Sequence, residues 1–415
     1  MKRLPEPGKA AAAIIAAAFV LASRTPFAGA AEVENRILSG YDSFIDRFTI
    51  LEQDTTEVVH EYYGGIATRL RAWNGRRLTF SNTFRFGNQS LDEDADLGLT
   101  VGSRENGLVQ ARAALHMKFF REGSDYEYGN DYGQGNLDLK AGKKFGRFYL
   151  LSRSRAEFVE YDERTLFDYD YRYIDTGITI EGGSYFDKFG RIAVHLGRRE
   201  APDTTELGYD RFVAEIEGRI TEGSLSADIS VWGDRRGYLG QTRSSYWSVY
   251  TSAGLRWSGA SGDIYALRLD SEVLLYDSQN TTFFDNHFLR AGLRGRFRLS
   301  EAAAVFLEPR LAGMMCEKFA EERYLEGSAV FGLDLFEGGG YWLSVSYEPG
   351  YRGYTLEDND IYSDFYYNRL SAMGSVDFAG RYSLNLFVSH DPEKHSRRTD
   401  DFSVTLLSLT LSAEF

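Results

Sequence analysis

The sequence has little that could support redox or metal chemistry. Cys316 is the only cysteine in 415 residues, so no disulfide can form within the chain. Because Cys316 follows Met314 and Met315 near the end of an expected strand, we interpret it as a small apolar residue rather than a nucleophile. No CxxCH haem-attachment motif occurs, and the six histidines show no spacing typical of metal ligands. We therefore expect no cofactor and no metal site.

Long apolar runs are missing beyond the start of the chain. After residue 30 no stretch approaches the roughly 20 apolar residues that a membrane-spanning helix needs. Proline is scarce, at seven residues, whereas glycine, tyrosine and phenylalanine number 42, 27 and 29. This composition is typical of a strand-and-turn protein with aromatic girdles. The net charge of -14 argues against a nucleic-acid partner.

Residues 1–30 have the organisation of a secretory signal peptide. A cationic start and an apolar run over 10–22 precede a small-residue cleavage site at 28–30. No cysteine stands directly after this site, which argues against a lipoprotein anchor. We expect the mature, exported chain to begin at Ala31 or Glu32 and to be more acidic than the precursor.

The last residues of the chain, FSVTLLSLTLSAEF over 402–415, alternate between two faces. One face holds Leu407, Leu409, Leu411, Ala413 and Phe415. A period of two predicts a strand with one face in hydrocarbon and one in water, although a half-buried strand of a soluble sandwich alternates in the same way. A terminal aromatic residue after apolar residues at alternate positions resembles the closing strand of Gram-negative outer-membrane β-barrels. The resemblance covers one strand and implies that Phe415, Leu411 and Leu409 form an assembly signal.

The same alternation recurs along almost the whole mature chain. Stripes are clear over 109–119, 289–299 and 382–388. Only a closed barrel can cross a membrane with strands, because an open sheet would leave unpaired backbone groups in lipid. We therefore predict an all-β fold, a single up-and-down antiparallel transmembrane β-barrel over 44–415. A secreted lectin-like sandwich is the competing fold of similar composition.

The connections between the expected strands alternate between short turns and longer polar segments. Short turns such as Asn74-Gly75 are expected to face the periplasm, and longer segments such as 88–94 the exterior. Both termini should then be periplasmic, which requires an even number of strands.

Counting the hairpins favours 20 strands, with 18 as the alternative. A first strand over 44–52, turning at Thr55-Thr56, is needed to reach this number, and 44–52 and 97–101 carry the weakest patterns. Residues 31–43 are expected to form a short periplasmic segment.

The longer segments are acidic. Clusters of aspartate and glutamate lie in 92–96, 125–131, 162–170 and 357–364. Such clusters could hold Ca²⁺ or Mg²⁺ that bridges lipopolysaccharide phosphates, but none has the spacing of an EF-hand loop. A solvated face is the interpretation that we favour.

A barrel of this size has a lumen too wide for side chains to fill, so a water-filled passage is expected. The arginines expected to line the pore are Arg112, Arg153, Arg155, Arg256, Arg268, Arg290, Arg294, Arg296, Arg298 and Arg310. The row from Arg290 to Arg298 is the densest patch of one sign, and an arginine ladder lowers the barrier for anions. Acids interleave with these arginines. A wall braced by ion pairs is therefore favoured over an anion-selective constriction.

These patterns predict a protein of the bacterial outer membrane. The leading hypothesis is a porin-like channel for passive passage of small hydrophilic solutes, anions among them. The alternative is a structural sleeve in a larger complex for electron transfer or polymer export. An inward-folded long loop would favour the channel, and an unobstructed lumen the sleeve.

No catalytic motif is present, so we expect no enzyme. The expected partners are outer-membrane lipid, lipopolysaccharide, the barrel-assembly machinery, and either further copies of the chain or a periplasmic protein.

Overall fold

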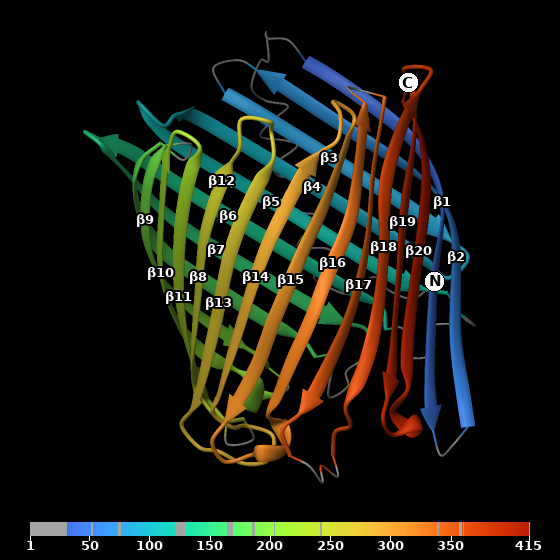
Figure 1. The fold of residues 1–415 in the computed structure, drawn as a ribbon. Coiled ribbons are helices and arrows are strands. Elements are labelled where there is room, and N and C mark those ends of the chain that lie inside the picture. The colour runs from blue at the N-terminus through green and yellow to red at the C-terminus, as the bar shows by residue number, and fades with distance from the viewer. Residues whose placement is uncertain are drawn as a thin grey trace.

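Alternation of apolar and polar residues runs through 20 strands that form one antiparallel sheet (Figure 1). The computed structural model describes residues 31–414 except 51–52, 74–75, 122–123, 125–129, 164–168, 185–186, 203, 241–242, 338–339, 357–358 and 360. Each strand pairs with the next along the chain, and β1 also pairs with β20, so the sheet closes into a barrel. The predicted all-β barrel of 20 strands is confirmed.

The strands are β1 (Ala31–Ile50), β2 (Gln53–Trp73), β3 (Arg76–Gly87), β4 (Ser90–Ser103), β5 (Gly107–Phe120), β6 (Tyr132–Phe145), β7 (Phe148–Tyr161), β8 (Tyr171–Gly183), β9 (Lys188–Glu200), β10 (Tyr209–Glu222), β11 (Leu225–Tyr238), β12 (Tyr246–Ser258), β13 (Ile264–Tyr276), β14 (Asn286–Arg298), β15 (Ala303–Cys316), β16 (Tyr324–Glu337), β17 (Tyr341–Tyr354), β18 (Phe365–Phe378), β19 (Tyr382–His395) and β20 (Phe402–Glu414). Short 3₁₀ helices lie in three of the loops, η1 (Thr205–Leu207), η2 (Ala320–Glu322) and η3 (Arg398–Asp400). Among the described residues, no helix has the length and apolar character needed to cross a membrane.

The two ends of the barrel differ in their connections. Connections from even- to odd-numbered strands are short and lie at the end where β1 begins and β20 ends, here called the short-turn end. Ala379 and Gly380 form one of these turns with φ values of 52° and 66°, the positive values that tight hairpins require. Most connections at the opposite end are longer, for example 277–285 and 355–364, and this is the long-loop end.

The prediction for the first strand was wrong in its bounds. Residues 31–43 are not a separate segment, because β1 runs from Ala31 to Ile50, and Thr55-Thr56 lie within β2. The pattern failed here because polar residues such as Asn35 and Ser39 occupy the same face of β1 as Val33 and Ile37. The expected cleavage site at 28–30 and Asn74-Gly75 lie outside the described residues.

In several long hairpins, an aspartate just before the second strand accepts a hydrogen bond from the backbone at the end of the first strand. Asp285, just before β14, accepts a hydrogen bond from the backbone N–H of Tyr276, the last residue of β13, at 2.7 Å. Asp364 does the same for Tyr354 at 2.8 Å. Equivalent bonds join Asp131 to Phe120, Asp170 to Tyr161 and Asp401 to His395. Part of the acidity of the loops therefore serves to satisfy backbone donors at strand ends.

Candidate functional site: the inner wall and the long-loop mouth

The two faces of the sheet differ in chemistry. Leu409 and Leu411 share one face of β20 and are 39% and 43% exposed. Exposed apolar side chains recur on the corresponding face of the other strands, for example Ile178 at 57% and Leu293 at 56%. The opposite face carries most of the arginines and carboxylates of the strands. The predicted two-faced strands are therefore present all around the sheet.

Contacts that skip a strand identify the charged face as the concave one. Arg296 of β14 lies 3.2 Å from Asp334 of β16, and Arg310 of β15 lies 3.3 Å from Glu348 of β17. Curvature brings side chains of alternate strands together on the inside of a barrel and separates them on the outside. The arginine-rich face therefore lines the interior, and the apolar face is convex.

Every arginine predicted to line the pore lies on this inner wall. The strand register places each of these arginines on the charged, concave face of the sheet. Their role in solute passage stays a prediction. Phe415 lies outside the described residues, so its expected role in assembly also stays a prediction, and Leu409 and Leu411 occupy the convex face.

Acids neutralise most of the arginine row. Asp270 of β13 is 2% exposed and lies 3.0 Å from Arg268 and 2.9 Å from Arg290. Glu308 lies 2.8 Å from Arg310 and 3.7 Å from Arg294. A wall braced by ion pairs is therefore the better description of this row than a ladder of free charges.

Two arginines at the short-turn end differ from the others. Neither Arg256 nor Arg298 makes an ion pair with a residue that the structure describes, and the Arg298 side chain donates to the carbonyl oxygen of Ser300 instead. Arg256 of β12 and Arg298 of β14 are separated by one strand, β13. These two arginines therefore add positive charge to the inner wall at the short-turn end.

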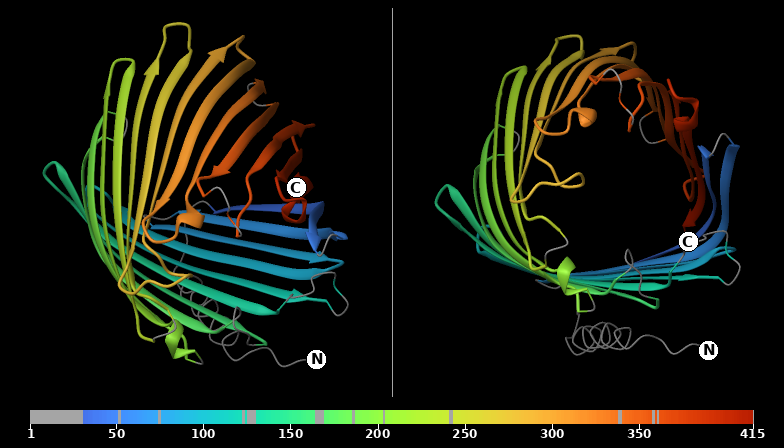
Figure 2. Two further views of the ribbon diagram at one scale, coloured as in Figure 1. Left: turned by 60° about the horizontal axis from the view of Figure 1, so that its bottom comes forward. Right: turned by 90° about the horizontal axis from the view of Figure 1, so that it is seen from below.

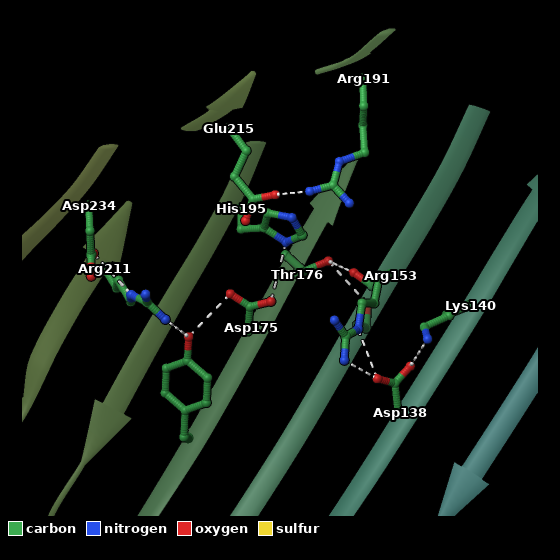
Figure 3. Close-up of polar contacts among 12 residues, drawn as sticks. Asp138, Lys140, Arg153, Asp175, Thr176, Arg191, His195, Arg211, Glu215 and Asp234 are labelled. Carbon is green, nitrogen blue, oxygen red and sulfur yellow. Dashed lines mark hydrogen bonds and ion pairs between the residues drawn. The ribbon is translucent and has the colours of Figure 1, made fainter. Parts of the chain in front are cut away.

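The wall formed by β6 to β11 is bridged in the same way (Figure 3). Asp138 contacts Arg153 and Lys140, and Glu215 accepts from Arg191 at 2.8 Å. Farther along, Arg211 donates to Asp234 at 3.0 Å. Arg155 and Glu157 of β7 form an ion pair at 2.5 Å, and Arg112 of β5 forms one with Asp96 of β4.

Three acids expected in an exterior loop belong to the inner wall instead. Asp92, Asp94 and Asp96 lie within β4, and only Asn88 and Gln89 separate β3 from β4. His116 of β5 lies 2.6 Å from Asp94. The charge of this run favours a loop, but acids at alternate positions are what a strand with a polar inner face requires.

Several long loops bend into the barrel at its long-loop end. In the view from below, the β13–β14 loop and the loop with η2 lie inside the ring of strands (Figure 2). Phe284 and Phe319 of these loops pack with ring centroids 5.0 Å apart. The side chain of Asn359 in the β17–β18 loop donates to the carbonyl oxygen of Glu321 at 2.7 Å. The loops therefore support one another and narrow the mouth.

A further contact joins the β17–β18 loop to the β19–β20 loop. The hydroxyl of Ser363 donates to Asp400 at 2.6 Å, and Arg397 lies 3.0 Å from the same carboxylate. Partial burial opposes ionisation of Asp400, but the Ser363 hydrogen bond and the Arg397 charge outweigh it and hold the pKa of Asp400 below its usual value. Asp400 is therefore ionised at neutral pH while it contacts Ser363 and Arg397.

Tyrosines gather on the inner wall at the long-loop end, each as the terminal residue of a strand. This tyrosine collar consists of Tyr132, Tyr161, Tyr171, Tyr209, Tyr238, Tyr246, Tyr276, Tyr324 and Tyr354. Four pairs of them face each other in register, among them Tyr246 and Tyr276 with ring centroids 5.4 Å apart. The sequence suggested girdles facing the membrane, but these side chains face inward. Their regular position beside the long polar segments was the signal that could have found them.

The collar borders a cavity of about 440 Å³ on the inner wall, formed by β11, β12, β13 and the loops that follow β11 and β13. Its lining includes Trp232, Tyr246, Tyr276 and Phe283 together with Arg236 and Glu272. Among the described residues, no group of three or more histidine, cysteine or acidic side chains is placed to hold a metal ion.

Comparison with known proteins supports the fold alone. No protein-family model matches the chain, and no curated protein is significantly similar in sequence. The siderophore receptor PirA from Pseudomonas aeruginosa is similar in structure, with a TM-score of 0.55, 8% identity, and coverage of 91% of this chain and 80% of the receptor.

Two further outer-membrane barrels are similar. The alcaligin receptor FauA from Bordetella pertussis has a TM-score of 0.52 at 10% identity, covering 91% of this chain and 76% of that protein. OpdK from P. aeruginosa has a TM-score of 0.52 at 12% identity, covering 92% of this chain and 99% of OpdK. The expected outer-membrane β-barrel fold is confirmed.

Proposed function

We propose that this protein is a channel of the bacterial outer membrane through which small hydrophilic solutes diffuse. The observation that carries the proposal is the charged inner wall of a closed 20-strand barrel whose mouth is narrowed by inward-folded loops. A barrel of this width holds water unless something fills it. Charged side chains that face water favour polar solutes over apolar ones.

The convex face supports the outer membrane as the location. Its exposed leucines and isoleucines suit hydrocarbon, and all strands pair with neighbours, so no backbone edge faces lipid. In this proposal the short-turn end faces the periplasm and the long-loop end faces the exterior. Lipid and lipopolysaccharide surround the barrel, and the assembly machinery inserts it.

Anions belong among the solutes. Arg256 and Arg298 present positive charge at the short-turn end without an ion pair to any described residue, and charge on a pore wall sets ion preference. OpdK, a structural neighbour, was determined with vanillate, which is a small anion. The paired arginines nearer the middle of the wall add little to this preference.

A structural sleeve is the less supported alternative. A partner protein or polymer inside the barrel would need the room that the β13–β14 loop and the η2 loop occupy (Figure 2). The mutual contacts of these loops, such as the packing of Phe284 against Phe319, would have to break.

The test is conductance in planar lipid bilayers. Purified protein should give stepwise current increments, and replacing residues 279–284 with two glycines should enlarge them because the β13–β14 loop no longer narrows the mouth. A mock preparation from cells without the gene is the control for contaminating porins. Silent bilayers across independent preparations would sink the channel function.

A further inference from the structure

The cavity beside the tyrosine collar has the features of a ligand site. Tyr246 and Tyr276 lie with ring centroids 5.4 Å apart, and Phe283 of the β13–β14 loop lies 5.7 Å from Tyr276. Trp232 lines the same cavity. Aromatic side chains that face a membrane anchor the barrel at the lipid headgroups, but rings on the inner wall face its water-filled interior and are accessible to a passing solute.

Packing explains only part of this aromatic surface. Phe283 covers one side of Tyr276, and Arg236 lies 5.7 Å from the Tyr246 ring. The cavity of about 440 Å³ remains open beside them, which is room for one or two sugar-sized rings.

The charged side chains that line the cavity balance, with Arg236 and Arg243 against Asp234 and Glu272. Asp234 is 1% exposed and accepts from Arg211 at 3.0 Å and from Arg236 at 3.2 Å. Glu272 accepts from Ser248 at 3.3 Å. Donors and acceptors are both present while the local charge is balanced, which suits a neutral polyhydroxylated ligand better than an ion.

We propose that this cavity is a subsite for neutral saccharides at the mouth of the channel. A pyranose ring has an apolar face of C–H groups that stacks on an aromatic ring, and hydroxyls at its edge that donate and accept hydrogen bonds. Tyr246, Tyr276 and Trp232 provide the stacking surface, and Arg236, Ser248 and Glu272 provide the hydrogen-bonding groups. The inference rests on the proposed channel function and names one class among its solutes.

Current recordings test the subsite directly. Maltose or cellobiose at millimolar concentration should interrupt the channel current, whereas mannitol should not, because an acyclic polyol has hydroxyls but no ring face. Tyr246→Leu and Tyr276→Leu should each weaken the block roughly three- to tenfold by removing an aromatic face. Tyr366→Leu is the matched control, because Tyr366 is 62% exposed and lies on the convex face of β18.

A second readout does not need the channel to conduct. Titrating the same sugars onto detergent-solubilised protein should change tryptophan fluorescence, and Trp232→Phe should abolish the change. Conducting channels with neither sugar block nor a fluorescence response would overturn the subsite and leave the channel function intact. Silent bilayers with a fluorescence response would overturn the channel function and support the subsite.

A separate observation concerns the convex face of β1 to β4. Asn35, Thr68 and Asn82 lie side by side in register across three strands, with Thr68 donating to Asn35 at 3.0 Å. Asn82 donates to Glu93 of β4 at 3.0 Å. These residues form the convex polar row.

Apolar rows flank the convex polar row on both sides. The row toward the short-turn end consists of Val33, Leu70 and Phe80, which are in register. The row toward the long-loop end consists of Ile37, Ile66 and Phe84, also in register. Ile37 and Ile66 are 53% and 52% exposed. The polar row therefore lies at the level of the hydrocarbon, where incompletely satisfied amides and a carboxyl group are costly.

We infer that a second copy of this chain covers the convex polar row. Each asparagine amide has both donors and an acceptor, so the row can pair with its own copy, as a symmetric interface requires. Lipid chains offer no hydrogen bonds to these groups.

Cysteine cross-linking tests this interface in the native membrane. In a Cys316→Ser background, Asn35→Cys, Thr68→Cys or Asn82→Cys should yield an oxidised species of twice the monomer mass. Ile178→Cys on the convex face of β8 is the matched control and should stay monomeric. Absence of cross-linking at all three positions, together with a monomeric mass in extracted membrane patches, would overturn the inference.

Discussion

The phenol of Tyr63 in β2 passes across β1 and lies 2.7 Å from the hydroxyl of Thr410 in β20. Gly40 of β1 lies beneath the ring, and a Cβ atom at this position would stand 2.3 Å from the phenol carbon Cζ. Only glycine leaves room for this contact. The pair therefore joins the strands on either side of β1, at the seam where the barrel closes.

Enlarging Gly40 should weaken the closed barrel. We expect Gly40→Val to displace the Tyr63 ring and to lower the temperature at which the folded band disappears in a gel-shift assay. Tyr63→Phe loses only the hydrogen bond and should lower the free energy of unfolding by about 1 kcal/mol. Gly133→Val is the matched control, because a Cβ at Gly133 would meet nothing within 4 Å. Equal melting of the two valine variants would contradict this account of the seam.

Neutralising Asp270 should make the pore more selective for anions. Its carboxylate compensates Arg268 and Arg290, so Asp270→Asn leaves two guanidiniums on the wall without their acid. The reversal potential in a salt gradient at about 0.1 M should shift toward anions, because higher salt screens wall charges. A shift toward cations would refute the compensating role of Asp270.

Removing the unpaired arginines should act in the opposite direction. We expect the double variant Arg256→Gln, Arg298→Gln to lower the ratio of anion to cation permeability. Arg198→Gln is the control, since Arg198 lies on the convex face of β9. An unchanged reversal potential in the double variant would show that these arginines do not set the preference for anions.

Deletion of Phe415 should impair assembly into the outer membrane. The expectation comes from the terminal strand pattern, in which Leu409 and Leu411 share the apolar face. The measurement is the yield of heat-modifiable protein in isolated outer membranes. Phe415→Tyr keeps an aromatic ring and should assemble normally, whereas normal yield of the deletion would show that the terminal residue is dispensable.

Acidification should release the β19–β20 loop. The pKa of Asp400 is lowered in the folded loop, so its contribution is complete above the ordinary aspartate pKa of roughly 4 and is lost as the pH falls through the lowered value. A spin label at Ser396→Cys in a Cys316→Ser background should become mobile in that acidic range. Asp400→Asn should show the mobile signal already at neutral pH. A label equally immobile from pH 7 to pH 2 would disprove this contact as the holding force.

The terminal strand and the row on β14 illustrate what a sequence pattern can predict. A period of two is a local property, so the faces that carry Leu409 and Arg290 were predictable from alternation alone. The strand number followed from the turns. The first strand and the start of β4 were missed because polar residues on the convex face of β1 and an acidic run in β4 break the local pattern.

Partners across strands could not be predicted in the same way. The sequence suggested that acids interleave with arginines, but the pairing of Arg296 with Asp334, two strands apart, depends on register and curvature. The tyrosine collar likewise depends on strand ends meeting at one rim. Its members are far apart along the chain.

An all-β barrel with an apolar face and a charged face was predictable from the sequence, because side-chain alternation and turn chemistry act over a few residues. Three properties depend on the folded barrel: which charges are neutralised, which face is concave, and the lining of the mouth by tyrosines under inward loops. Those properties arise only when curvature and register bring distant strands within the 3 to 4 Å over which ion pairs and hydrogen bonds act.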